Sequence, residues 1–223
     1  MKTTLKASIR ARFLAIRKKG LYIDFWIRSL DSALCNTLVE MGYSAIVVEK
    51  TEPDACRDIV VFEKKVIEAF SRKELLSKLK GVSRGKYIVS VKPRSVESAR
   101  VAARDSRVDS IILDGDSARF IDKHQFNLMK QFHKPLEFSL NNWFRTSLNS
   151  RVSMYRVLYL HIHRYGLPLI TSSGASVWNE AVHPKSAINF LSQLINVPPE
   201  VSIQYISVYP RDILVRKGFE VVR

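Results

Sequence analysis

The sequence predicts an α/β protein: a single TIM-like (β/α) barrel, somewhat irregular, with a basic helical extension at its N-terminus. Short β-rich runs alternate with helical patterns along the chain, and this alternation implies parallel strands joined by right-handed crossovers. Most of the runs are apolar on both faces, as in Ile46-Val47-Val48 and Ile111-Ile112-Leu113. Such runs are typical of a parallel sheet that is buried on both sides.

Eight runs qualify as strands, which is the number of strands in a TIM barrel. They are Leu21–Ile27, Ser44–Glu49, Asp58–Glu63, Tyr87–Lys92, Ser110–Asp114, Pro135–Leu140, Pro168–Ser172 and Val201–Val208. The link between the second and third runs, Lys50–Arg57, is too short for a full helix, so we expect the barrel to be irregular there. An open doubly wound sheet would show the same alternation and is the main alternative.

The helices between the strands have recognisable first and last residues. Ser71 and Glu74 form the capping-box pattern Ser-x-x-Glu, and Gly81 ends that helix. Proline suits the first turn of a helix, so Pro184 marks another helix start. The other predicted helices are Asp31–Met41, one opened by Ser95, Asp122–Phe132 and Ser150–Tyr165, and the helix from Pro184 runs to Ile195.

The chain divides into a short extension and one domain. Residues 1–20 contain seven basic residues and no acidic one, and apolar residues recur in them at helical spacing. We therefore predict a basic amphipathic helix at 1–20. Residues 21–223 show no repeat, no low-complexity tract and no flexible linker, so we assign them to a single barrel domain.

The charge balance points to a polyanionic partner. The chain has 36 Lys and Arg against 21 Asp and Glu, a formal net charge of +15, which is more than solubility requires. No apolar run reaches the length of a membrane span, and no export signal is evident, so we expect no membrane association. Cys35 and Cys56 make neither a disulfide framework nor a zinc site, which favours a reducing, cytoplasmic location.

The predicted strand ends concentrate cations where barrel proteins place their functional loops. In chain order these positions are Arg28, Lys50, Lys64, Lys65, Lys92, Arg94, Arg119, the segment Asn141 to Arg145, Ser172-Ser173-Gly174 and Arg211. A mouth lined in this way would bind a nucleic-acid backbone, with an affinity that falls steeply as salt is added. The alternative interpretation is that so basic a chain places some cations on every loop.

One turn and a few carboxylates suggest a free-standing phosphate-handling enzyme as an alternative function. Ser172-Ser173-Gly174 would cradle a phosphate with its hydroxyls and backbone N–H groups, or would be a structural turn in which Gly174 has a positive φ. Asp24 or Glu137 would then act as general acid or base. Further candidate carboxylates are Glu49, Glu63 and Asp114, although acids at strand ends are more often ion-paired than catalytic.

Other site types find little support. His161 and His163 fall in a predicted helix, where residues two apart point in different directions and do not share a metal ion. Gly-rich nucleotide-binding motifs and the Gly-x-Ser-x-Gly elbow are absent from the sequence. Trp26, Trp143 and Trp178 fall near strand ends; core filling is the expected role of Trp26, whereas the other two would fill the core, stack on bases or anchor a partner.

The order and spacing of several segments resemble the protein component 3 family of archaeal ribonuclease P. The likeness runs from about residue 20 to 217 and rests on Tyr22–Arg28, Gly42–Val48, Val108–Ile112, Leu169–Ala175 with Trp178, His183-Pro184-Lys185, and Ile203–Pro210. The resemblance implies a TIM-like barrel that is a protein subunit of a ribonucleoprotein cutting the 5′ leader from precursor tRNA. It also implies that the RNA subunit, with Mg²⁺, carries the chemistry, and that this chain has no turnover alone and binds no cofactor itself.

The resemblance further implies partners and a binding surface. The expected partners are the ribonuclease P RNA, precursor tRNA through the holoenzyme, a small RRM-like protein subunit and other ribonuclease P proteins. The expected RNA contacts are taken from the mouth and the adjoining helix starts: Lys92, Arg94, Arg100, Arg104, Arg145, Arg151 and Lys185. No catalytic residue is assigned to this chain.

Overall fold

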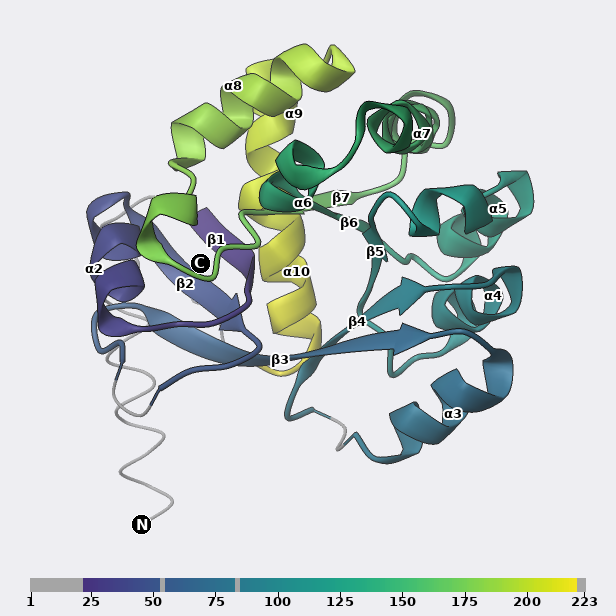
Figure 1. Ribbon diagram of the computed structural model, residues 1–223, viewed down its shortest axis with the longest axis horizontal. Helices are drawn as coiled ribbons and strands as arrows, with labels where there is room; N and C mark the ends of the chain where they lie inside the picture. The colour runs from purple at the N-terminus through teal and green to yellow at the C-terminus, as the bar shows by residue number, and fades with distance from the viewer. Residues whose placement is uncertain (1–21, 53–54, 83–84, 220–223) are drawn as a thin grey trace.

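The computed structural model describes residues 22–52, 55–82 and 85–219, and its strands form a nearly closed barrel (Figure 1). The described residues form seven strands in sequence order, each parallel to the next. They are β1 (Tyr22–Ile27), β2 (Tyr43–Val48), β3 (Val60–Ala69), β4 (Ile88–Pro93), β5 (Ser110–Leu113), β6 (Leu136–Ser139) and β7 (Leu169–Ser172). The predicted TIM-like barrel is confirmed. The predicted basic helix at residues 1–20 lies outside the described residues.

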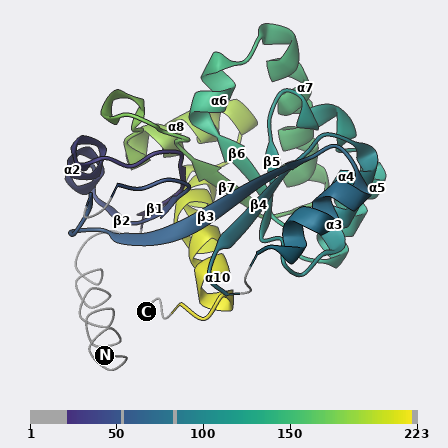
Figure 2. The ribbon, with the colours of Figure 1, turned by 60° about the horizontal axis from the view of Figure 1, so that its bottom comes forward.

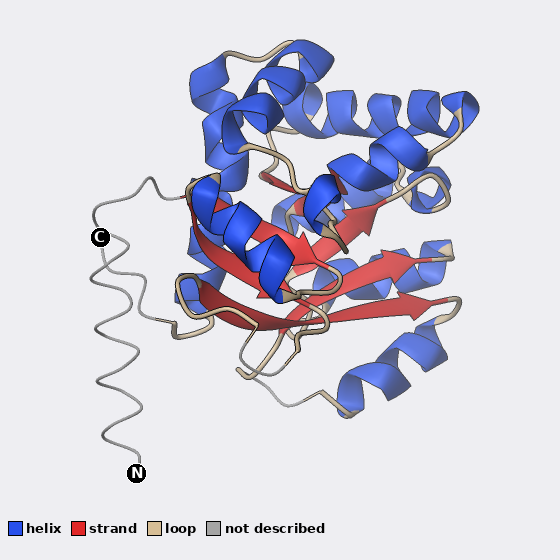
Figure 3. Ribbon diagram, turned by 60° about the vertical axis from the view of Figure 1, so that its left-hand side comes forward, coloured by secondary structure: helices blue, strands red, loops and turns tan. Residues whose placement is uncertain are grey.

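Helices cover the outside of the strands (Figure 3). The α-helices are α2 (Ser32–Glu40), α3 (Arg72–Lys80), α4 (Val96–Arg104), α5 (Lys123–Gln131), α6 (Leu140–Arg145), α7 (Leu148–Tyr159), α8 (Pro184–Ile195), α9 (Pro199–Ser202) and α10 (Val208–Arg216). Shorter helical turns are η1 (Ser117–Phe120), η2 (Leu160–Arg164), η3 (Trp178–Glu180) and η4 (Ile203–Ile206). In Figure 2, α3, α4 and α5 lie side by side on the outer surface.

The helix starts follow the predicted capping residues. The side chains of Asp31, Ser71, Ser95 and Asp122 each accept a hydrogen bond from a backbone N–H in the first turn of α2, α3, α4 and α5. An N-terminal cap of this kind contributes roughly 1 kcal/mol to helix stability. These local signals explain why the predicted helix boundaries agree closely with the structure.

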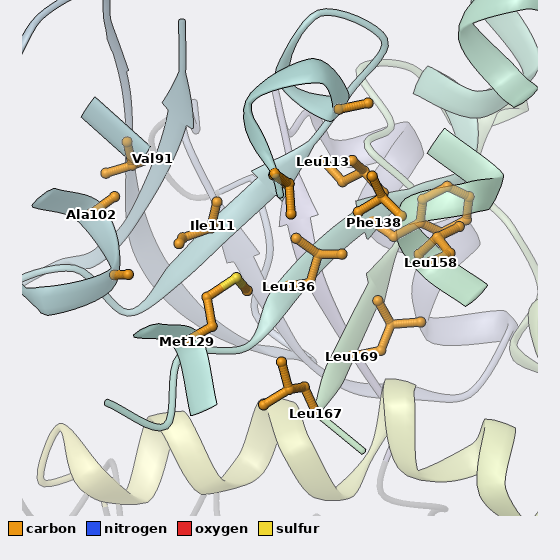
Figure 4. Packing of buried hydrophobic residues seen from close by; sticks show 14 of the residues in the cluster. Val91, Ala102, Ile111, Leu113, Met129, Leu136, Phe138, Leu158, Leu167 and Leu169 are labelled. Atoms are coloured by element: carbon orange, nitrogen blue, oxygen red, sulfur yellow. The ribbon is translucent and has the colours of Figure 1, made fainter. Parts of the chain in front are cut away.

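The main core lies between the strands and the outer helices. Figure 4 shows Val91, Ile111, Leu136 and Leu169 on successive strands, packed against helical side chains such as Met129. A second cluster fills the barrel interior, where α10 adds Ile213 and Leu214. Within the described ranges, no helix combines the length and apolar character needed to cross a membrane.

The predicted eighth strand, Val201–Val208, is wrong. This stretch forms α9, η4 and the start of α10, and Arg211 therefore lies within α10 rather than in a loop at a strand end. Tyr205 and Ile206 are buried, and η4 and α10 pack against β1 and β7, so the stretch stabilises the barrel without joining the sheet. The β-branched residues of this stretch are compatible with a strand or with a helix, and tertiary packing decides which of the two forms.

The barrel closes between β1 and β7 through bonds just beyond the strand ends. The Gly174 N–H donates to Trp26 O at 3.0 Å, and the Arg28 N–H donates to Ala175 O at 2.8 Å. Gly174 has a φ of 69°, and a Cβ at this position would clash with Ser139 Oγ. This seam excludes the open doubly wound sheet, because the edges of an open sheet do not meet.

The third strand is longer than predicted, which changes the position of two cations. Because β3 extends to Ala69, Lys64 and Lys65 lie within the strand and not at the mouth, as the sequence had suggested. Lys64 is 2% exposed, and its ammonium group lies 2.5 Å from a Glu137 carboxylate oxygen inside the barrel. Lys65 points outward and its ammonium lies 4.9 Å from the centre of the Tyr87 ring.

The two cysteines are joined by a disulfide. Cys35 lies in α2 and Cys56 in the link between β2 and β3, with their Cα atoms 5.5 Å apart. This bond was not predicted from the sequence, which suggested no disulfide framework. The bond connects α2 to a link that is too short to form a helix of its own.

Candidate nucleic-acid interface

Cationic side chains gather around a buried tryptophan at the carboxyl ends of the strands, the barrel mouth. Trp26 is 1% exposed, and its indole N–H donates to Glu49 at 2.7 Å. The Lys92 ammonium group lies 4.8 Å and the Arg28 guanidinium group 5.1 Å from the centre of the Trp26 ring. Cation–π contacts of this kind position two cations at the mouth without neutralising them.

Lys92 lines a cavity of about 270 Å³ at the mouth. The cavity is otherwise lined by Asp114, Gly115, Asp116, Asn142, Arg145, Thr146 and Ser150. Burial lowers the pKa of Lys92, with Asp114 and Glu49 opposing this effect and Arg28 adding to it. No described residue forms a hydrogen bond or an ion pair with the Lys92 ammonium group. A phosphate oxygen entering the cavity would supply that missing partner.

Arg94, in contrast, is committed to the protein itself. Two of its nitrogens donate to the Asp114 carboxylate at 2.8 and 3.0 Å, and its Nε donates to Glu68. Burial alone would raise the pKa of Asp114, but the hydrogen bonds from Arg94 and from the Ser117 N–H hold it below its ordinary value. Arg94 therefore ties the ends of β3, β4 and β5 together and has little capacity left for a ligand.

The turn after β7 holds one of the chain's own carboxylates where a phosphate was predicted. The Ser173 N–H donates to Asp24 at 3.1 Å, and the Ala175 N–H donates to Ser173 Oγ at 3.1 Å. The N–H groups of Gly174 and Ser176 are also bonded within the protein. The predicted phosphate cradle is therefore wrong, and the structural interpretation, with Gly174 at a positive φ, is confirmed.

The candidate carboxylates are mostly paired or buried, which weakens the alternative enzyme. Asp24 and Glu137 are 1% and 0% exposed, and no substrate reaches them without opening the barrel. Glu49, Glu63 and Asp114 contact Trp26, Lys86 and Arg94 respectively. The described residues thus present no accessible acid or base beside a phosphate-binding turn.

Asp24 makes the stability of the fold depend on pH. Burial raises the pKa of Asp24 to about 6, although hydrogen bonds from Ser173 and Trp26 and the Lys64 charge act in the opposite direction. Between about pH 4 and 6 the native state keeps a proton that the unfolded chain has lost, so this group's contribution to stability falls as the pH rises. We expect Asp24→Asn to gain about 2–3 kcal/mol relative to the parent chain over this interval.

Urea unfolding of both proteins at pH 4 and 6.5 measures this effect. The exposed Asp58→Asn variant is the control and should follow the parent chain at both pH values. If the free energies of unfolding of Asp24→Asn and the parent differ by the same amount at both pH values, the raised pKa of Asp24 is contradicted.

The two neighbouring histidines point in different directions, as predicted. His161 is fully buried, and one ring nitrogen lies 2.9 Å from Pro168 O; burial lowers its pKa to about 4. His163 is exposed on η2, with a ring nitrogen 2.6 Å from Ile195 O. Among the described residues, no group of three or more His, Cys, Asp or Glu side chains is placed to hold a metal ion.

The three tryptophans separate into two core residues and one surface residue. Trp26 is buried as predicted, and Trp143 is 9% exposed, with its ring 5.7 Å from that of Phe138. Trp178 is 60% exposed on η3, in the loop that follows β7. Only Trp178 among them is free to meet a ligand.

Comparison with known proteins identifies relatives of this chain. No protein-family model matches it. Ribonuclease P protein component 3 of Aeropyrum pernix is 29% identical over 181 residues, which cover 75% of this chain and 82% of that protein. The chain is therefore similar in sequence to ribonuclease P protein component 3. The family resemblance found in the sequence is thereby confirmed.

Solved structures share the fold of this chain. A chain in the cryo-EM structure of archaeal ribonuclease P with mature tRNA superposes with a TM-score of 0.74 at 16% identity, covering 90% of this chain and 95% of that one. The crystal structure of an uncharacterized protein gives a TM-score of 0.62 at 8% identity, over 89% of this chain and 74% of that one. At these identities the likeness concerns the fold.

The RNA contacts implied by the component 3 resemblance lie in three places. Lys92 and Arg145 line the mouth cavity, and Arg94 lies beside it. Arg151 donates to the Thr146 and Phe144 carbonyls close to the cavity, while Lys185 is exposed in the first turn of α8. Arg100 and Arg104 lie on α4 outside the barrel; Arg100 pairs with Asp122, and Arg104 ends the helix.

Arg28 is a mouth residue that the list of expected RNA contacts lacks. Its Nη2 donates to Asn142, which lines the same cavity as Lys92, and its Nε is buried without a hydrogen-bond partner in the described structure. The available signal was its place directly after the first strand. The Arg28 guanidinium adds a second positive charge beside the cavity.

Proposed function

We propose that this chain is a protein subunit of ribonuclease P that binds and stabilises the catalytic RNA for removal of the 5′ leader from precursor tRNA. The homology to component 3 carries the proposal. The chain then contributes to an endoribonuclease as part of the holoenzyme, while the RNA subunit performs the phosphodiester chemistry. The proposal assigns the Mg²⁺ of that reaction to the RNA and no cofactor to this chain.

The barrel mouth supports an RNA-binding role. Lys92 and Arg28 are held at the mouth with donor groups that no described residue uses, and Arg145 lines the same cavity. Several cations around one opening suit a backbone of repeated phosphates. With a net charge of +15, the whole chain favours approach to a polyanion.

The outer face of α7 supports contact with another protein subunit. Leu148, Val152, Tyr155 and Tyr159 follow one another at spacings of four, three and four, and they are 74%, 62%, 40% and 45% exposed. A helix face with apolar side chains at these spacings is typical of one that docks into a partner's groove. We propose that a small RRM-like subunit and other ribonuclease P proteins are the partners and that the particle is cytoplasmic.

Reconstitution tests the proposed function. The ribonuclease P RNA and the other protein subunits are assembled with and without this chain, and 5′ cleavage of precursor tRNA is measured at limiting Mg²⁺. We expect cleavage to be faster with the chain present, and no cleavage by the chain alone. Hydrolysis by the isolated chain, or an unchanged rate in the particle, would contradict the proposal.

A further inference from the structure

Trp178 is a large aromatic side chain displayed at the surface beside the mouth. It is 60% exposed, whereas the other two tryptophans are almost completely buried. No described residue forms a ring–ring or cation–π contact with it. Since burying a tryptophan side chain is favourable, so large an exposed ring points to a ligand that covers it.

The loop that carries Trp178 is held in place on both sides. The Glu180 carboxylate accepts the Ser176 N–H at 2.8 Å and forms an ion pair with Arg145. Asn141 donates its side-chain N–H groups to Glu180 O at 2.8 Å and to Ser173 O at 2.9 Å. These bonds fix the ring before any ligand arrives, which lowers the entropic cost of binding.

Further along the loop, the Tyr43 hydroxyl donates to Val182 O at 2.7 Å. The neighbouring η3 also packs against α2, and both lie on the same side of the barrel in Figure 1. The indole ring is thus presented from a rigid base that extends from α6 to α2.

The surroundings of Trp178 favour a nucleic acid over a protein partner. Binding hot spots between proteins lie inside well-packed apolar patches, whereas the exposed chain neighbours of Trp178 are one apolar residue, Val177, and the polar Asn179. Residues 140–179 contain four arginines and no acidic residue, and the carboxylate that follows them, Glu180, is ion-paired with Arg145. The Arg145–Glu180 pair also joins the Trp178 loop to the cavity that holds Lys92.

We propose that Trp178 stacks on an unpaired base of an RNA strand whose phosphates lie along the mouth cations. The inference rests on the proposed function and adds to it a ligand class, a single-stranded nucleotide. Stacking uses the face of a base, and every base has one, so the site tolerates different sequences. Double-stranded RNA keeps its bases stacked on one another and cannot use the site.

The test uses the full chain with two probes, a single-stranded RNA 12-mer without secondary structure and a blunt duplex of the same length. Base–aromatic stacking contributes about 1–3 kcal/mol, so Trp178→Ala should weaken binding of the single strand by about 5- to 150-fold. Trp178→Phe, which keeps an aromatic face, should retain most of the affinity for the single strand. Binding of the duplex should be the same for all three proteins.

Intrinsic fluorescence gives a second measurement. Because Trp26 and Trp143 are buried, emission accessible to an external quencher comes mainly from Trp178. We expect the single strand to quench this emission and to protect it from acrylamide. Two results would overturn the stacking proposal: Trp178→Ala loses equal affinity for the single strand and the duplex, or its RNA affinity is unchanged. If its RNA affinity is unchanged but the particle loses a protein subunit, Trp178 binds a protein instead.

The outcomes separate this proposal from the proposed function. If Trp178→Ala binds RNA normally and Lys92→Glu does not, stacking is wrong and the RNA-binding function stands. If the parent chain binds neither probe and does not affect the reconstituted particle, the proposed function itself fails.

Discussion

Replacing Glu137 with leucine is expected to destabilise the barrel by about 3–5 kcal/mol at neutral pH, because a buried ion pair loses one partner. Glu137 and Lys64 are both fully buried, with 2.5 Å between their charged groups. The other carboxylate oxygen accepts hydrogen bonds from Ser90 at 2.8 Å and from Ser110 at 2.7 Å. The variant therefore leaves the Lys64 ammonium without its counter-charge, with only the Phe25 carbonyl still accepting from it, and leaves two hydroxyl groups without their carboxylate acceptor.

The double variant Lys64→Met/Glu137→Gln separates the charge from the packing. It removes both charges and keeps an amide oxygen that accepts from the two serines, so we expect it to recover most of the lost stability. The control is Glu63→Gln, which breaks the exposed pair with Lys86 and should change stability by less than about 1 kcal/mol. Urea unfolding measures the stability of all three variants. A loss below about 1 kcal/mol for Glu137→Leu would show that the interior pair is not desolvated.

Reversing two mouth cations should have the largest effect on RNA binding. The double variant Lys92→Glu/Arg145→Glu changes both basic residues that line the mouth cavity. We expect RNA affinity to fall by about 10- to 100-fold at roughly 0.15 M salt, and the dependence of log affinity on log salt to become shallower by about two. Both changes follow from the loss of two phosphate contacts.

The matched control reverses the same number of charges away from the mouth. Lys80→Glu/Lys130→Glu alters the last turns of α3 and α5, where both side chains are exposed. Its net charge equals that of the mouth variant, so any effect of overall charge is the same in both. Equal losses of RNA affinity in the two variants would show that the charge acts from a distance and that the mouth has no special role.

Local signals in the sequence predict much of this fold. Asp31, Ser71, Ser95 and Asp122 each begin a helix as predicted, because an N-terminal cap bonds to residues two or three positions away. Seven of the strands are predicted by apolar runs, which are also a local signal in the sequence. The strand prediction for Val201–Val208 is wrong because this stretch packs against the seam between β1 and β7. Composition alone carries no information on such tertiary packing.

The candidate site depends on distant partners and was predicted less well. Ser173 meets Asp24, which is 149 residues away, and this contact turns a predicted phosphate cradle into a closed structural turn. Lys64 meets Glu137, 73 residues away, which moves it from the mouth to the interior. Lys92 and Arg145 were predicted correctly as mouth residues, because each lies close to the carboxyl end of a strand.

Site-specific cross-linking in the assembled ribonuclease P particle tests the central claim most directly. A photoreactive residue is introduced at Arg145, which is exposed at the mouth, and in a separate protein at Lys130 on the outer helix α5. We expect irradiation to join the chain to the RNA from position 145 and not from position 130. RNA cross-links from position 130 alone would contradict an RNA-binding mouth.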